Sequence, residues 1–184
     1  MKTKRFAMVL DSSKCIDCKA CTVACKIENK VPMGQDNYRN WVAEGPLRGK
    51  FPDLGQSFQP GQCMQCANTP CDQVCPTGAT RVNRDGIVLV DDHKCIGCKY
   101  CITACPYNAR YYNEVTGAVD KCTFCVQRIY RGRQPACVET CPTKVRVFGD
   151  LNDRNSEVSR LLVKHAYKVE KPEMGTDPFL FYII

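Results

Sequence analysis

Sixteen of the 184 residues are cysteines, and their spacing constrains this chain more than any other feature. The cysteines fall into four groups of four with none left over. Groups one and three share the spacing C-x2-C-x2-C-x3-C, group two is C-x2-C-x4-C-x3-C, and group four is C-x2-C-x11-C-x3-C. In chain order the groups are Cys15, Cys18, Cys21 and Cys25; Cys63, Cys66, Cys71 and Cys75; Cys95, Cys98, Cys101 and Cys105; and Cys122, Cys125, Cys137 and Cys141. Scattered buried thiols would not show this regularity.

The spacing of groups one and three is typical of proteins that bind [4Fe–4S] clusters. In that pattern three cysteines wrap one cluster, and the fourth binds the other cluster of a pair. A proline follows the last cysteine of groups two, three and four, as in ferredoxins. Four complete groups therefore predict four [4Fe–4S] clusters, with all sixteen cysteines as iron ligands and no three-iron centre.

Two other uses of cysteine fit less well. Structural zinc favours two Cys-x2–4-Cys pairs separated by a longer loop, whereas these cysteines lie closer together. A disulfide scaffold is expected in a short secreted chain with a signal peptide. The apolar stretch at residues 6–10 is too short for such a signal, and no apolar run approaches the ~20 residues of a membrane span. We therefore expect neither an export signal nor a transmembrane helix.

The formal net charge of +7 would suggest a partner with phosphates, such as a nucleic acid. Four clusters with thiolate ligands would bring the net charge to about −1, so we interpret the excess of basic residues as counter-charge for the cofactors. Lys14, Lys94 and Lys121 precede the first cysteine of their groups, and Lys19 and Lys99 lie inside two loops. These lysines either tune the cluster potentials or are simply solvated. We expect no nucleic-acid binding.

An internal repeat predicts the architecture. Shifted by 80 residues, the segment 14–25 lies on the segment 94–105, and Cys75 and Cys141 share a Cys-Pro-Thr ending. The order of group types therefore alternates along the chain. This predicts an α+β fold of two ferredoxin-like modules, arranged in tandem or interleaved, with short strands and helices around the clusters.

Local patterns predict the connecting elements. A hairpin is expected over 81–91, with a type I′ turn at Asp85-Gly86, and a second around 111–119. Short helices are expected near 20–29 and 123–131. A further helix should begin at about 153, because Val158, Leu161, Leu162 and His165 follow helical spacing. We expect an edge strand around Trp41, a loop over 45–61 that could touch a partner, and no ligand role for His93 or His165.

The chain resembles the four-cluster iron–sulfur subunit of the molybdenum oxidoreductases over nearly its whole length. Beside the four-group pattern, the resemblance lies in segments 135–138 (PACV), 147–151 (VFGDL) and 172–182 (PEMGTDPFLFY). Members serve polysulfide, thiosulfate, arsenate and dimethyl sulfoxide reductases. The compact length is most similar to the polysulfide and thiosulfate reductase type.

The resemblance implies a subunit that relays single electrons and has no catalytic residues of its own. Its partners would be a molybdenum or tungsten pterin catalytic subunit and an integral membrane, quinone-reactive anchor subunit in anaerobic respiration. It would be held at the membrane through these partners, on the periplasmic face after export with the catalytic subunit, or else on the cytoplasmic face. A free polyferredoxin that shuttles electrons between soluble enzymes is the alternative.

The resemblance also pairs group one with group four, and group two with group three. This implies modules at 1–60 plus 120–184 and at 61–119, with set 1 at the catalytic-subunit end of the relay and set 4 at the membrane end. The implied ligand sets are Cys15, Cys18, Cys21 and Cys141 (set 1); Cys25, Cys122, Cys125 and Cys137 (set 2); Cys63, Cys66, Cys71 and Cys105 (set 3); and Cys75, Cys95, Cys98 and Cys101 (set 4).

Overall fold

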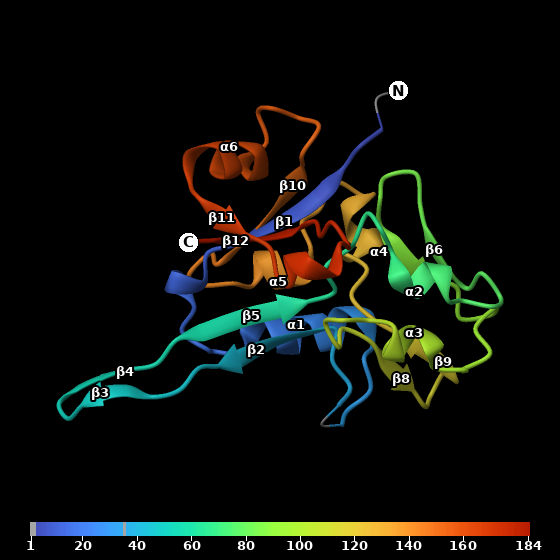
Figure 1. The fold of residues 1–184 in the computed structure, drawn as a ribbon, viewed down its shortest axis with the longest axis horizontal. Coiled ribbons are helices and arrows are strands. Elements are labelled where there is room, and N and C mark those ends of the chain that lie inside the picture. Colours follow the sequence, from blue (N-terminus) through green and yellow to red (C-terminus); the bar gives the residue numbers. More distant parts are fainter. Residues whose placement is uncertain (1–2, 35) are drawn as a thin grey trace.

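A computed structural model describes residues 3–34 and 36–184, and its short elements form an α+β fold (Figure 1). The helices are α1 (Ala20–Asn29), α2 (Pro70–Gln73), α3 (Tyr100–Thr103), α4 (Val126–Ile129), α5 (Ala136–Glu139) and α6 (Glu157–Lys164). The strands are β1 (Phe6–Leu10), β2 (Asn40–Glu44), β3 (Arg48–Lys50), β4 (Asp53–Gly55), β5 (Phe58–Gln62), β6 (Thr80–Val82), β7 (Val88–Val90), β8 (Tyr111–Asn113), β9 (Ala118–Asp120), β10 (Arg146–Asp150), β11 (Tyr167–Lys168) and β12 (Leu180–Ile183). This composition confirms the expected α+β class. Along the described residues, no helix has the length and apolar content needed to cross a bilayer.

A four-stranded sheet joins segments that are far apart in the sequence, in the order β10-β1-β12-β11. β1 pairs antiparallel with β10, from Phe6 opposite Asp150 to Leu10 opposite Arg146, and parallel with β12. Every residue of β1 is buried. An apolar run such as FAMVL suits this position, because an inner strand covered on both faces has no side that must be polar.

The two faces of β1 contact different layers, because side chains alternate along a strand. Phe6, Met8 and Leu10 belong to a core cluster that contains cysteines from several groups. Ala7 and Val9 belong to another cluster, which is built around α6 and whose described members are all apolar residues other than cysteine. One face of the sheet thus supports cysteine loops, and the other is an ordinary apolar layer.

Helix α6 covers the second face of the sheet, as Figure 1 shows beside β10 and β1. Val158 is fully buried there, which confirms the helical face expected from the spacing of residues 158–165. The helix begins at Glu157 rather than near 153, because the Ser156 hydroxyl accepts a hydrogen bond from the Ser159 amide at 3.1 Å and caps it.

Both predicted hairpins are confirmed: β6 pairs with β7, and β8 pairs with β9. The type I′ turn expected at Asp85-Gly86 is wrong, because the last pair is Val82 with Val88 and five residues connect them. The Asn83 side chain explains the longer loop. Its oxygen accepts hydrogen bonds from the amides of Asp85 and Ile87, which replaces the tight-turn bonding.

The predicted helix at 20–29 is confirmed as α1, whereas the one at 123–131 is shorter than expected. Only Val126–Ile129 is helical there. Phe124 and Cys125 have φ angles of 53° and 51°, so the chain is left-handed where the sequence suggested a first helical turn. This conformation directs the chain around the cysteines of group four instead of extending the helix.

The expectation of a loop over 45–61 is wrong. β2 pairs with β5 over five positions beside α1, and β3 pairs with β4 beyond them, so residues 40–62 form an arm whose outer part, β3 and β4, projects from the body in Figure 1. The strand expected around Trp41 is confirmed as β2. Trp41 lies against Gly61, where an added Cβ atom would come within 2.5 Å of the indole ring, so glycine is required at this contact.

The boundaries proposed for two modules stay a prediction. The central sheet uses residues 6–10 and 146–183, whereas the two short hairpins lie within residues 80–120. Helix α1 packs against α5, and α2 packs against α3. These neighbours bring group one beside group four and group two beside group three.

Candidate iron–sulfur sites

The cysteines of set 1 line one pocket, which forms where the loop before α1 meets the turn after α5. Its lining includes all four members, Cys15, Cys18, Cys21 and Cys141, together with Arg146. The backbone amide of Val145 points at the Cys141 sulfur at 3.3 Å. Amides aimed at sulfur in this way stabilise a thiolate, which is the form that binds iron.

The cysteines of set 4 line a matching pocket between α3 and the two short hairpins. Its lining includes Cys75, Cys95, Cys98 and Cys101. The amides of Thr80 and Val119 each lie 3.4 Å from a sulfur, those of Cys75 and Cys95 respectively.

The loops of sets 1 and 4 are copies in backbone as well as in sequence. Lys19 and Lys99 both adopt left-handed φ angles, of 55° and 63°, and the helices that follow begin 80 residues apart, at Ala20 and Tyr100. The repeat read from the sequence is thus a structural repeat.

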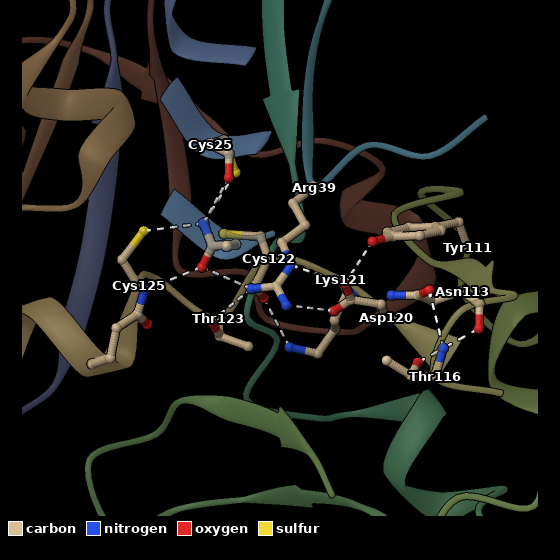
Figure 2. A network of polar contacts seen from close by, with 12 residues as sticks. Cys25, Arg39, Tyr111, Asn113, Thr116, Asp120, Lys121, Cys122, Thr123 and Cys125 are labelled. Atoms are coloured by element: carbon tan, nitrogen blue, oxygen red, sulfur yellow. Dashed lines mark hydrogen bonds and ion pairs between the residues drawn. The ribbon is translucent and has the colours of Figure 1, made fainter. Parts of the chain in front are cut away.

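Set 2 is buried at the centre of the protein, where all four of its cysteines lie below the surface. The Asn29 amide donates to the sulfurs of Cys25 and Cys125, both labelled in Figure 2, at 3.5 and 3.7 Å. Burial, and then the nearby sulfurs of Cys137 and Cys125, raise the pKa of the Cys25 thiol to about 12. Burial also raises the pKa of Cys137 to about 11.

Set 3 is gathered in the same way from α2, the segment before it and the end of group three. Burial raises the pKa of Cys66 to about 12, and the sulfurs of Cys63, Cys71 and Cys105 contribute in the same direction. Burial raises the pKa of Cys71 to about 11 against the opposing effect of Arg110. Every predicted set is therefore brought together in space, whereas iron ligation by these cysteines stays a prediction.

The donor chemistry of the sets fits [4Fe–4S] clusters. Each set offers four thiols, and the neighbours of their sulfurs include backbone amides and the cations Arg110 and Arg146. Among residues 3–34 and 36–184, no group of three or more His, Cys, Asp or Glu side chains closes around a single metal ion. Nη2 of Arg146 is buried with no acceptor in the described protein, although its residue lines the set 1 pocket. A cluster in that pocket would supply the missing acceptor.

Reasoning from the sequence missed several side chains at these sites. Arg39 donates to Asn29 and pairs with Asp120, which links it to set 2 (Figure 2). Arg110 and Arg146 are buried beside cysteines. A signal for these two was present, because each lies five residues after the last cysteine of its group.

The lysines that precede the cysteine groups differ in environment. Lys121 is fully buried, whereas Lys14 and Lys94 are exposed. His93 is exposed on the surface, and His165 follows the end of α6. Position next to a cysteine therefore does not by itself decide whether a lysine lies inside the protein.

Comparison with known proteins identifies the family. Residues 55–151 match the family described as 4Fe-4S dicluster domain, a segment that spans parts of both proposed modules. The B component of the polysulfide reductase of Wolinella succinogenes is 46% identical over 183 residues, which cover 98% of this chain and 94% of that protein. The B component of the tetrathionate reductase of Salmonella typhimurium is 45% identical over 97% of this chain and 72% of that protein. A putative dimethyl sulfoxide reductase iron-sulfur subunit of Halobacterium salinarum is 40% identical over 97% of this chain and 78% of its own.

The chain is an iron–sulfur protein of the 4Fe-4S dicluster class. Within that class it belongs to the family of iron–sulfur subunits of the polysulfide, tetrathionate and dimethyl sulfoxide reductases. The resemblance noted from the sequence is thereby confirmed, as are the [4Fe–4S] type of cofactor and a role in electron transfer within a reductase complex.

Proposed function

We propose that this chain relays single electrons through four [4Fe–4S] clusters, one in each set. The relay runs between a molybdenum or tungsten pterin catalytic subunit and an integral membrane, quinone-reactive subunit. The chain itself catalyses no bond chemistry. The [4Fe–4S] cluster supplies a one-electron redox centre, and the protein's part is to hold, space and tune it.

The observation that carries this proposal is the serial order of the four sets. Cys21 of set 1 lies near Cys137 of set 2. Cys122 of set 2 lies near Cys63 of set 3. Arg110 contacts Cys71 of set 3 and also faces Cys101 of set 4. An electron entering at either end therefore has a neighbouring site at every step.

Exposure of the cysteines supports a relay with two accessible ends. Cys18 in set 1 and Cys98 in set 4 are exposed, whereas all four cysteines of set 2 are buried. Burial of set 2 keeps solvent from its cluster, and the exposed end loops bring the terminal clusters within reach of partner subunits. We assign set 1 to the catalytic-subunit end and set 4 to the membrane end.

The proposal includes attachment to the membrane through the partner subunits, on the periplasmic face. Support for the partners comes from relatives whose names place them as single components of larger reductases. A free polyferredoxin would be isolated alone and would function without such partners. Affinity purification under mild detergent, followed by identification of the bound subunits, separates these two functions.

The test uses the complex isolated with its partners. Iron analysis should give about sixteen irons per chain, and a value near eight or a dominant three-iron EPR signal would refute four clusters. Cys98→Ser should slow quinone-linked turnover and spare substrate reduction by a dye that feeds the catalytic subunit. Cys18→Ser is the matched variant, because it changes the equivalent exposed cysteine 80 residues earlier. The opposite pattern for Cys98→Ser would reverse the assigned direction.

A further inference from the structure

Three buried cations remain unexplained by the ligand sets: Arg146, Lys121 and Arg110. Each lies at the junction between two neighbouring sets. We propose that these side chains act as fixed positive charges, one for each step of the relay, and that each raises the reduction potentials of the two clusters it separates. This inference rests on the proposed function, because it uses the four ligand sets.

Arg146 occupies the junction between sets 1 and 2. It is 2% exposed, and its guanidinium faces Cys21 of set 1 and lies near Cys137 of set 2. Nη1 donates to the side-chain oxygen of Gln62 at 2.7 Å, whereas Nη2 is buried without an acceptor in the described protein. Buried donors in folded proteins are normally satisfied, so Nη2 is left free for a group that fills the adjoining pocket.

Arg110 occupies the junction between sets 3 and 4. Nη2 donates to the Cys71 sulfur of set 3 at 2.8 Å, and Nη1 donates to the Thr80 hydroxyl at 3.1 Å. The guanidinium also faces Cys101 of set 4. The fixed fork of an arginine can reach two acceptors at once, which suits a side chain held between two sulfur sites.

Lys121 occupies the junction between sets 2 and 3. Its Nζ donates to the carbonyl of Cys122 at 2.9 Å and to the carbonyl of Val88. Burial lowers the pKa of Lys121, and the nearby sulfurs of Cys63 in set 3 and Cys122 in set 2 oppose that effect by favouring the charged form. The only polar contacts of the ammonium in the described protein are neutral carbonyls, so its charge has no protein partner.

The absence of carboxylates is common to all three. Among the described residues, none of these cations forms an ion pair, whereas Arg39 beside set 2 is paired with Asp120. The other buried arginine, Arg128, is paired with Glu28 and Glu139. An unpaired charge inside a protein is strongly unfavourable.

Clusters with thiolate ligands carry negative charge, and reduction adds one more negative charge. A nearby fixed cation therefore stabilises the reduced form more than the oxidised form, and so raises the potential.

The internal repeat shows that these charges depend on the junctions and not on the motif alone. The position five residues after the last cysteine is Arg110 in group three and Arg146 in group four. In group two it is Thr80, the residue that accepts from Arg110, and in group one it is the exposed Lys30. At this motif position a buried cation thus occurs only where two sets meet.

The experiment is a redox titration of the isolated complex, followed by EPR, after iron content has been measured. Arg146→Met, Lys121→Met and Arg110→Met should each lower the midpoint potentials of two clusters and leave the other two unchanged. We expect at least a tenfold shift in the oxidised-to-reduced ratio of each affected cluster, which is about 59 mV for a one-electron couple. Arg146→Lys and Arg110→Lys, which keep the charge, should restore most of that shift.

Lys14→Met and Lys94→Met are the matched controls for Lys121→Met, because each removes a lysine that also directly precedes the first cysteine of a group but lies on the surface. These should change the ratio less than twofold. If the neutral variants retain full iron and the oxidised-to-reduced ratio of every cluster changes less than twofold, the inference is wrong while the proposed function stands. If the unmodified complex itself lacks four clusters, the proposed function fails first.

A second measurement decides the matter if the methionine variants lose iron. In the unmodified complex labelled with heavy-nitrogen arginine, the reduced clusters of sets 1, 3 and 4 should show magnetic coupling to guanidinium nitrogen. Set 2 is left out because Arg39 lies beside it. Absence of that coupling on all three clusters would overturn the roles of Arg110 and Arg146.

Discussion

The ion pair between Arg39 and Asp120 makes a strong prediction about set 2 (Figure 2). Nη2 of Arg39 lies 2.8 Å from Oδ1 of Asp120, and Nε donates to Oδ2 at 3.1 Å. The side chains are only 15% and 17% exposed. Arg39 also lies close to Cys25 and Cys122, so Asp120 neutralises a cation that would otherwise act fully on this cluster.

Asp120→Asn removes that neutralising charge with little change of shape. Opposite charges ~4 Å apart attract by about 4 kcal/mol at an effective dielectric constant of about 20. Removing one member of a buried pair costs about 3–5 kcal/mol, and the partial exposure favours the lower end. The asparagine still offers an acceptor to the Tyr111 hydroxyl, which donates to Asp120. We therefore expect the complex to lose about 3 kcal/mol of stability.

The same substitution should raise the midpoint potential of the set 2 cluster, because Arg39 is then unopposed. We expect at least a tenfold change in the oxidised-to-reduced ratio of this cluster, which corresponds to about 59 mV for a one-electron couple. The assays are an EPR-monitored redox titration and denaturant-induced loss of cluster absorbance. Asp92→Asn is the control, because that side chain is 61% exposed, and it should change neither. A lowered potential in the Asp120 variant with full iron content would refute the charge reasoning.

Two further predictions concern the apolar layer under α6. Val158→Ala should destabilise the chain by about 2 kcal/mol, because Val158 is fully buried, and should leave the iron content unchanged. Cluster loss on unfolding measures the stability and iron analysis measures the iron content, and a drop in iron would contradict the prediction. Iron removal by a chelator should expose the amides of β6 to β9 to hydrogen exchange before those of β1 and β10. The reason is that Val88 and Val119 pack mainly with cysteines, whereas β1 also packs on an apolar layer. The reverse order of exchange would show that the apolar layer needs the clusters.

The sequence was most informative where the determinants are local. Cysteine spacing and the 80-residue repeat pointed to the cofactor type, and the hairpins expected over 81–91 and around 111–119 followed from turn residues between short strand-like segments. The part of the arm beyond β2 was missed because β5 becomes recognisable as a strand only through its pairing with β2 across the intervening segment. Pro60 also argued against a strand there, yet a two-stranded arm leaves one edge of each strand free of hydrogen bonds and tolerates it.

Charged residues were the other failure. A lysine or arginine in a sequence is expected at the surface, since these side chains are almost never fully buried without a partner. The sequence contains no direct sign that Lys121 is enclosed while Lys14 and Lys94 are not, because the difference comes from the strands packed around each loop. The ligand sets themselves were inferred from the resemblance, and iron analysis of cysteine variants remains their test.

The position of β1 has a consequence for how the chain reaches its native state. In the described structure β1 pairs with β10 and β12, so its partner strands lie between residues 146 and 183. Contacts of such large sequence separation form slowly, because the long intervening loop must close before they contribute any stability. The hairpins at 80–90 and 111–120 join near neighbours and can form during synthesis. We therefore expect β1, the earliest of these strands to leave the ribosome, to be the last to pair, so that the cysteine loop directly after it stays accessible until then.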